Sequence, residues 1–302
     1  MIHVRIPATT ANMGPGFDCI GMAFQMYNHL WVEEAETLES KLIIENKNPA
    51  FRIPLNENNL IYKSIKRFYS EAGFCGIPSL KIIQDDRIPL TRGLGSSAAC
   101  VVGGLLTANA LTGEKLSRDD LCFLAAKIEG HPDNSTPAIV GGIVVGALSE
   151  KKLDYIKIIA NDKLKFAVMI PDFRLSTSKA RSVLPKKISH ADAVFNVSRA
   201  ALMISAILTG DYEKLSAATE DRLHQPYRLP LVPEMDKIFY NARLNGASGV
   251  FLSGAGPSII AIYEERADGF ITGMKNFFQK IHAKWDIITL APDNEGAAVN
   301  IT

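Results

Sequence analysis

The chain has 302 residues, of which 47% are hydrophobic and 22% are charged, and its formal net charge is +1. This length suits two domains of ordinary size, and the composition predicts a folded protein without long disordered segments. The near-zero charge argues against bulk binding to nucleic acid or to an anionic membrane. We see no apolar run of the roughly 20 residues that a membrane helix needs, so we predict neither a nucleic-acid nor a membrane partner.

The cysteines favour a reducing compartment. Cys19, Cys75, Cys100 and Cys122 are far apart, and none has a histidine at zinc-ligand spacing. The first residues lack the basic region and apolar stretch of a secretory signal. We therefore expect a cytoplasmic protein with reduced thiols.

The first third of the chain predicts a mixture of strands and helices. Residues 2–6 alternate as in a strand, and we expect Pro7 to end it. Residues 8–18 are dense in Gly, Pro, Asn and Asp, and on composition alone they form a connecting loop. We predict strands over 27–34, 41–45 and 79–84 and a helix over 59–72. Because helices and strands do not strictly alternate, an α+β fold is favoured over a doubly wound sheet.

Residues 88–99, IPLTRGLGSSAA, form a glycine turn that leads into a predicted helix over 98–110. The first turn of a helix has unpaired N–H groups and the positive end of the helix dipole, so such a turn can bind a phosphate. No lysine lies near this turn, which excludes a Walker A loop. Taken alone, the turn is equally consistent with the cap of an ordinary buried helix.

A second predicted helix, over 121–128, leads to Glu129. A carboxylate at this point could bind Mg²⁺ together with the hydroxyl of Ser97, although a single glutamate at a helix end is more often only a solvated charge. His131 lies between Gly130 and Pro132, and we interpret it as a structural loop residue.

The second half begins after the polar and charged stretch 150–165, so we predict domains over 1–160 and 161–302. A buried strand over 166–170 precedes a segment in which Thr177 and Arg181 would share one helix face. We predict helices over 191–208, 211–223 and 270–281, and a strand over 287–291. Residues 250–263 read as strand, glycine turn and strand, with Gly254 and Gly256 in the turn.

Several of these segments resemble the motifs of one family, the GHMP kinases, in the order in which that family has them. Pro89–Ala99 is similar to their nucleotide loop, and the turn with Gly254 and Gly256 is similar to their third motif. Residues 7–18, PATTANMGPGFD, resemble the first motif of the homoserine kinases within this superfamily. The pair Thr177 and Arg181 and the segment 221–228 also match homoserine kinases.

The resemblance implies a fold and a reaction. The fold is α+β, the two-domain GHMP kinase fold, with an N-terminal domain like ribosomal protein S5 domain 2, a ferredoxin-like C-terminal domain and the site between them. The implied reaction is the ATP-dependent phosphorylation of L-homoserine to O-phospho-L-homoserine, a step of threonine biosynthesis, with Mg²⁺ as cofactor. A homodimer is the expected assembly.

The resemblance also implies roles for individual residues. The residues matching the ATP loops are Pro89, Leu90, Thr91, Arg92, Gly93, Leu94, Gly95, Ser96, Ser97, Ala98, Ala99, Gly254 and Gly256. Ser97 and Glu129 match the magnesium ligands, although in some homoserine kinases a longer insertion separates the glutamate from the following Asp-Asn pair. The residues matching the substrate site are Asn12, Asp18, Asn134, Arg181, His224 and Arg228, and catalytic roles are implied for Asn134, Thr177 and Arg181.

Asn134 falls where mevalonate-kinase-type relatives carry an aspartate that is the proposed base. Because an amide cannot take a proton from the substrate, our hypothesis is that Asn134 orients the substrate hydroxyl. Three alternatives remain: a kinase for a mevalonate-type or sugar alcohol, a nucleotide-binding regulator without activity, and a purely structural protein. The two arginines together with Asn12 and Asp18 favour a zwitterionic substrate.

Overall fold

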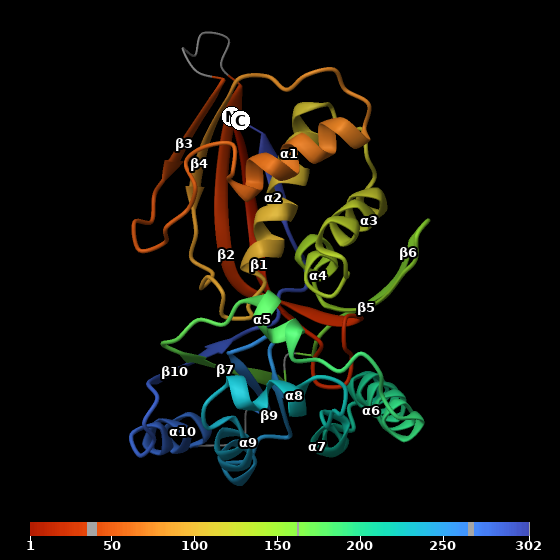
Figure 1. The fold of residues 1–302 in the computed structure, drawn as a ribbon, viewed down its shortest axis with the longest axis vertical. Coiled ribbons are helices and arrows are strands. Elements are labelled where there is room, and N and C mark those ends of the chain that lie inside the picture. Colours follow the sequence, from red (N-terminus) through yellow and green to blue (C-terminus); the bar gives the residue numbers. More distant parts are fainter. Residues whose placement is uncertain (35–40, 162, 265–268, 302) are drawn as a thin grey trace.

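The structure is a computed structural model that describes residues 1–34, 41–161, 163–264 and 269–301. The described strands form a seven-stranded sheet and a four-stranded sheet, one above the other in Figure 1, and helices pack against each of them. The predicted α+β class is confirmed by this mixture of helices with largely antiparallel sheets.

The seven-stranded sheet forms the upper part of the molecule in Figure 1 and contains both described ends of the chain. Its main path is β11-β1-β2-β4-β3, and β5 pairs with both β2 and β6. The pairing of β3 with β4 is parallel, whereas the other pairs are antiparallel. The strands are β1 Ile2–Ala11, β2 Ile20–Glu34, β3 Leu42–Asn46, β4 Leu80–Asp85, β5 Ile143–Leu148, β6 Leu153–Ile158 and β11 Ala298–Ile301.

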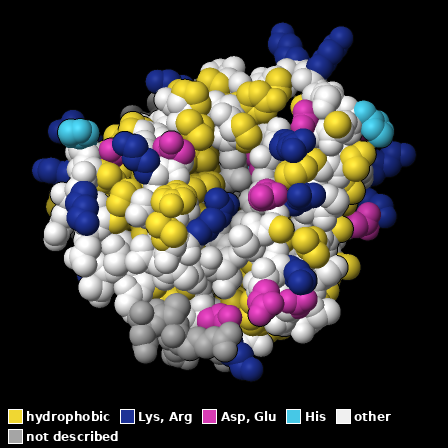
Figure 2. Space-filling model, turned by 90° about the horizontal axis from the view of Figure 1, so that it is seen from below, with side chains coloured by type: hydrophobic (Ala, Val, Ile, Leu, Met, Phe, Trp, Pro, Cys, Tyr) yellow, Lys and Arg dark blue, Asp and Glu magenta, His cyan; other side chains and the backbone are white. Residues whose placement is uncertain are grey.

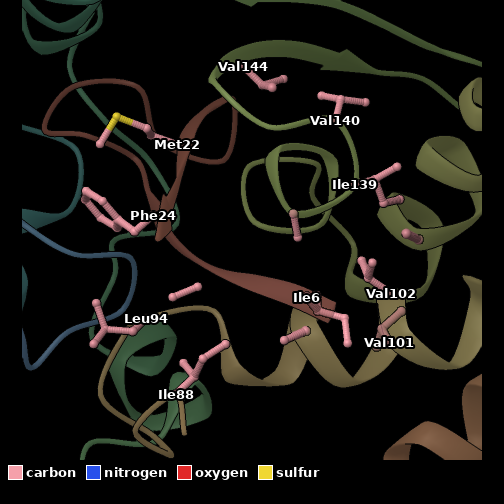
Figure 3. Packing of buried hydrophobic residues seen from close by; sticks show 14 of the residues in the cluster. Ile6, Met22, Phe24, Ile88, Leu94, Val101, Val102, Ile139, Val140 and Val144 are labelled. Carbon is pink, nitrogen blue, oxygen red and sulfur yellow. The ribbon is translucent and has the colours of Figure 1, made fainter. Parts of the chain in front are cut away.

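Four helices lie on one side of this sheet: α1 Leu60–Glu71, α2 Ser96–Leu111, α3 Arg118–Glu129 and α4 Ser135–Val140. The central one is α2, which has no charged residue and is buried along most of its length between β1, α1 and α3. Figure 3 shows Ile6 of β1, Val101 and Val102 of α2 and Ile139 of α4 in the shared core. This packing holds the N-terminus of α2 in a fixed position.

The four-stranded sheet forms the lower part of the molecule, with the antiparallel order β10-β7-β9-β8. Its strands are β7 Leu164–Pro171, β8 Gly249–Leu252, β9 Ile259–Glu264 and β10 Trp285–Leu290. The α-helices of this part are α5 Thr177–Ser182, α6 His190–Thr209, α7 Leu215–Ala218, α8 Gln225–Arg228, α9 Met235–Leu244 and α10 Phe270–Phe278. Two 3₁₀ turns, Tyr212–Lys214 and Leu229–Leu231, precede α7 and follow α8.

The first predicted strand is longer than expected. We expected Pro7 to end it, but β1 continues to Ala11 with a register shift between Pro7 and Ala8. A proline that lacks its N–H group is tolerated at such an irregularity, so it does not end the strand. The predicted loop over 8–18 therefore begins only at Asn12.

Other elements also differ from the prediction. The helix expected over 211–223 is confirmed only in part, since the 3₁₀ turn and α7 end at Ala218. Asp221 then accepts the backbone N–H groups of Leu223, His224 and Gln225 in the turn that leads into α8. Sequence patterns missed α4, α9 and β11. Half of the stretch expected to be a junction between domains, residues 150–165, belongs to β6 and the start of β7.

The division into domains 1–160 and 161–302 stays a prediction. Strands β1 to β6 belong to the upper sheet and β7 to β10 to the lower one. However, β11 returns from the C-terminal segment and pairs with β1, matching Ile2 with Ile301. The last residues of the chain therefore contribute to the first sheet.

Among the described residues, one helix, α6, is long and apolar enough to cross a membrane. The sequence analysis did not single out this apolar stretch. Figure 2 views the end of the molecule that carries α6, α7, α9 and α10 and shows hydrophobic side chains gathered among charged ones. Along α6, Val197 and Leu208 are 70% and 64% exposed, whereas Met203 and Ala206 are buried against the protein. One such helix is weak evidence for a membrane span, since helices of soluble folds pass the same test.

Candidate active site

The glycine turn between β4 and α2 has the conformation that a phosphate-binding loop needs. Gly93 and Gly95 have φ angles of 77° and 72°. A Cβ on Gly95 would lie 1.9 Å from the Thr9 hydroxyl oxygen, and one on Gly93 would lie 2.2 Å from the Ser253 carbonyl oxygen. Glycine alone fits these two positions, because it has no Cβ and adopts positive φ without strain.

This turn lines a cavity of about 690 Å³ between the two halves of the molecule. Residues 89–98 line it, whereas Ala99 lies one residue further inside α2. The buried hydroxyl of Ser96 has no hydrogen-bond partner among the described residues. The free N–H groups of the first turn of α2 and this hydroxyl are therefore available to a bound anion.

The turn between β8 and β9 lies against the glycine turn of residues 89–95, here named the phosphate loop, and its Gly254 and Gly256 line the same cavity. Ser253 donates a hydrogen bond of 2.6 Å to the Gly93 carbonyl, and the Ser258 N–H donates to the Arg92 carbonyl at 3.2 Å. Arg92 also reaches the other half of the protein, because its guanidinium donates to the Pro171 and Asp172 carbonyls. These contacts hold the two glycine turns together.

Ser97 and Glu129 form the candidate metal position. The Ser97 hydroxyl donates to Glu129 Oε1 at 3.2 Å, although the two residues are separated by 32 positions in the chain. Helix α3, capped by Ser117 at its start, carries Glu129 as its last residue to the cavity. Burial raises the pKa of Glu129, because the ionised carboxylate is poorly solvated at this position. A hydroxyl and a carboxylate oxygen are ligands that suit Mg²⁺, so these residues fit it.

His131 and Asp133 are cavity residues that the sequence analysis missed. We interpreted His131 as a structural loop residue, but its Nδ1 lies 2.5 Å from Asp133 Oδ1 and both residues line the cavity. With Asp18 they form a cluster whose ligand atoms all lie within 4.8 Å of one another. The dipeptide Asp133-Asn134 after Glu129 was visible in the sequence, but the approach of Asp18 from a loop more than a hundred residues away was not.

Asp18 and Arg181 form an ion pair across the cavity. Arg181 donates two hydrogen bonds to the Asp18 carboxylate, of 2.7 and 3.0 Å, from α5 to the loop after β1. The pKa of Arg181 is raised, mainly because its hydrogen bonds to the Asp18 carboxylate favour the charged guanidinium. Thr177, the first residue of α5, also lines the cavity, and it lies on the same helix as Arg181, which agrees with the helix that their spacing suggested.

The amide of Asn12 holds the loop after β1 in place. Its Nδ2 donates to the Gly254 carbonyl at 2.9 Å, and its Oδ1 accepts from the Asp18 N–H at 3.0 Å. Asn12 lines the cavity but is only 3% exposed. In this structure it therefore orients Asp18 and the turn at Gly254.

Arg228 is buried at the floor of the cavity, and His224 lies behind it. Arg228 donates to the carbonyls of Ala180 and Gly254 and, from Nη1, to His224 Nδ1 at 3.0 Å. His224 Nε2 donates to the Gly14 carbonyl at 2.7 Å. The neutral imidazole with its proton on Nε2 satisfies both contacts. Among the described residues, Arg228 lines the cavity, whereas His224 does not and lies behind Arg228; the substrate contacts implied for these two residues stay predictions.

The titration of His224 gives a testable pH dependence of stability. Burial lowers the pKa of His224 to about 4, below the ordinary value of 6.5. The unfolded chain takes up this proton at a higher pH than the folded chain, so the stabilisation is complete above pH 6.5 and is lost as the pH falls toward 4. This one group should lower the free energy of unfolding by about 2 kcal/mol between roughly pH 7 and pH 5.

Urea unfolding of the wild type and of His224→Gln at the two pH values checks this prediction. The variant is expected to be less stable at neutral pH but to lose less stability on acidification. Equal losses in the two proteins would show that His224 does not cause the acid sensitivity.

The far end of the cavity is lined by residues for which the sequence gave no signal: Arg52, Ile53, Pro54, Asn59, Leu60, Gln84 and Asp86. A buried chain of hydrogen bonds runs there from Asn59 through Gln84 to Asp86 and on to Asn28. Burial raises the pKa of Asp86 to about 6. The chain fixes the wall of this end of the cavity with its polar groups satisfied.

Known proteins share both the sequence and the fold. Residues 59–142 match the family described as GHMP kinases N terminal domain, and residues 203–280 match the GHMP kinases C terminal family. A homoserine kinase of Caldicellulosiruptor saccharolyticus is 52% identical over 99% of this chain and 96% of its own length.

The solved structures agree. The crystal structure of a homoserine kinase from Cytophaga hutchinsonii has a TM-score of 0.87 at 29% identity, covering 99% of this chain and 97% of the other. A mevalonate kinase, at 17% identity and a TM-score of 0.71 over 97% of this chain and 99% of its own, shares the fold alone. The expected two-domain GHMP kinase fold is confirmed, and the chain is a kinase that belongs to the homoserine kinase family of the GHMP kinases.

Proposed function

We propose that this kinase transfers the γ-phosphoryl group of ATP to the hydroxyl of L-homoserine, a step of threonine biosynthesis, with Mg²⁺ as cofactor. The observation that carries the proposal is one cavity that joins an anion-binding helix terminus to a paired aspartate and arginine. The names of the relatives support the same reaction. A homodimer stays a prediction.

The phosphate loop and the turn at Gly254 and Gly256 would hold the ATP phosphates with backbone N–H groups. Phosphoryl transfer depends mainly on positioning and on neutralising charge, so preorganised amides at the start of α2 can supply much of the effect. Bound Mg²⁺ would neutralise the phosphate oxygens. Ser97 and Glu129 would hold it, with the Ser96 hydroxyl facing the same anion.

The Asp18 and Arg181 pair would recognise the two charges of the amino acid. A zwitterion offers an ammonium group to Asp18 and a carboxylate to Arg181, so it replaces one ion pair by two. Asp133 would add negative charge and His131 hydrogen-bonding capacity beside Asp18, where the ammonium group would lie, and Arg228 would add positive charge beside Arg181. Mevalonate has a carboxylate but no ammonium group, so it would engage Arg181 and leave Asp18 without a cationic partner, whereas an uncharged sugar would offer no charge to either residue.

Asn134 would orient the reacting hydroxyl. It lines the cavity at the start of α4, between Asp133 and the phosphate loop. Its amide cannot act as a general base for the proton of the substrate hydroxyl. That proton would leave with the transferring phosphoryl group or through solvent. Thr177 and Arg181 would close the other side of the substrate.

The test is ADP formation by the purified protein with Mg·ATP and a panel of acceptors: L-homoserine, D-homoserine, L-serine, mevalonate and galactose. We expect a strong preference for L-homoserine. Turnover of only mevalonate or galactose would keep the ATP site and contradict the roles of Asp18 and Arg181. No turnover of any acceptor would contradict the proposal.

Removal of the candidate metal carboxylate should change the response to Mg²⁺. We expect Glu129→Gln to lower kcat/KM for Mg·ATP roughly 100-fold at limiting Mg²⁺ and to recover partly at high Mg²⁺, because one charged ligand is lost. Glu150→Gln, at an exposed glutamate outside the cavity, is the matched control. A rate that depends on Mg²⁺ in the same way in both variants would remove Glu129 from the metal site.

A further inference from the structure

We infer that Thr9 is a positioning residue that fixes which side of the Asn134 amide faces the reacting groups. The inference rests on the proposed function, since it concerns how Asn134 would act. Thr9 lies in β1 and is completely buried. Its hydroxyl donates a hydrogen bond of 2.9 Å to Asn134 Oδ1, across 125 positions of the chain.

Thr9 contacts both parts of the site at once. Its backbone N–H donates to the Leu94 carbonyl of the phosphate loop at 3.2 Å. Its hydroxyl also lies where a Cβ on Gly95 would be placed, so the turn rests directly on it. The neighbouring Thr10 hydroxyl instead lies 2.8 Å from Ser253 Oγ. The hydroxyl of Thr9 therefore connects β1 to Asn134, and its backbone N–H connects β1 to the phosphate loop.

The direction of this hydrogen bond decides what Asn134 can do. A threonine hydroxyl has a single hydrogen, and here that hydrogen is given to the carbonyl oxygen of the amide. The NH₂ group then lies on the other side, where it makes a long hydrogen bond of 3.4 Å to Asp133 Oδ1. Asn134 therefore presents a hydrogen-bond donor to the cavity. A donor suits the oxygen of the substrate hydroxyl or of the transferring phosphoryl group, whereas a rotated amide would present an acceptor.

Thr9→Val removes the donor but keeps the shape and the backbone hydrogen bond to Leu94. We expect kcat to fall about 10-fold with little change in KM for Mg·ATP, because one oriented hydrogen bond is lost. Thr9→Ser keeps a hydroxyl and should restore most of kcat. If Thr9 only supported the phosphate loop, Thr9→Val would instead raise KM for Mg·ATP and leave kcat nearly unchanged.

The deciding experiment is a double-mutant cycle with Asn134→Ala, with thermal unfolding of every variant as a check on folding. We expect Thr9→Val to lower kcat in the wild type but to add nothing in the Asn134→Ala background. If the two substitutions instead lowered kcat independently, so that the double variant showed the product of the two single effects, the inference would be overturned. If Asn134→Ala itself leaves kcat unchanged, the proposed role of Asn134 fails; if only Thr9→Val leaves it unchanged, the role of Thr9 alone fails. Thr9→Ala, which removes the hydroxyl without adding a methyl group, serves the same cycle if the valine variant does not fold.

Discussion

Gly95→Ala is expected to abolish most kinase activity and to destabilise the fold. The new Cβ would lie 1.9 Å from the Thr9 hydroxyl oxygen and 3.1 Å from the Thr9 Cβ, and Thr9 is completely buried in a strand that cannot move aside. Overpacking and the left-handed φ together should cost about 2–4 kcal/mol. The phosphate loop would also shift away from the start of α2, so we expect kcat/KM for Mg·ATP to fall by at least about 100-fold.

Gly113→Ala is the matched control, because it isolates the steric contact from the backbone conformation. Gly113 follows α2 with a φ of 73°, almost equal to the 72° of Gly95, but a Cβ there would meet no atom within 4 Å. This variant should lose only about 1 kcal/mol and keep its activity. Urea unfolding and steady-state kinetics of both variants measure the difference. Two equally stable and equally active variants would show that Thr9 does not constrain the loop.

The parts of the site that lie close together in the chain could be predicted from the sequence. Residues 89–99 and the turn with Gly254 and Gly256 have local signals, because glycines at fixed spacing and a following apolar helix are visible in a short window. The helix start at Asn59 was also predictable, since its side chain accepts an N–H group of its own helix.

The contacts between distant segments could not be predicted from residue patterns. The hydrogen bonds from Arg181 to Asp18 and from Thr9 to Asn134 join residues separated by more than a hundred positions. The same limit applies to β11, whose short, weakly alternating sequence becomes a strand only because β1 offers it a free edge. Tertiary context decides such strands more than local propensity does.

His224 and His131 also show that local sequence does not reveal whether a histidine is buried or lines the cavity. The sequence suggested a substrate contact for His224 and a structural role for His131. In the structure His224 is enclosed between Gly14 and Arg228, whereas His131 lies in the cavity beside Asp133. A histidine in a loop carries no local signal for burial, so its environment depends on which distant segments cover it.

Arg228→Lys should affect both substrate binding and stability. Arg228 is 1% exposed, and its guanidinium reaches the Ala180 and Gly254 carbonyls and His224 Nδ1. A single ammonium group cannot reproduce these three contacts, so buried acceptors lose their donors at a cost of about 2–4 kcal/mol. If Arg228 also holds the substrate carboxylate, KM for L-homoserine should rise at least about 10-fold with a smaller change in kcat.

Arg222→Lys is the matched control. It shows whether the loss of stability and the rise in KM are specific to Arg228 or follow from replacing any arginine in this segment. The Arg222 side chain is 50% exposed and forms one ion pair of 3.3 Å with Asp192. Because exposed ion pairs contribute little, this variant should stay within about 0.5 kcal/mol of the wild type and keep its KM. Kinetics with varied L-homoserine and urea unfolding of both variants give the two readouts. A destabilised Arg228→Lys with an unchanged KM would mean that Arg228 supports the turn at Gly254 without binding the substrate, leaving recognition of the carboxylate to Arg181.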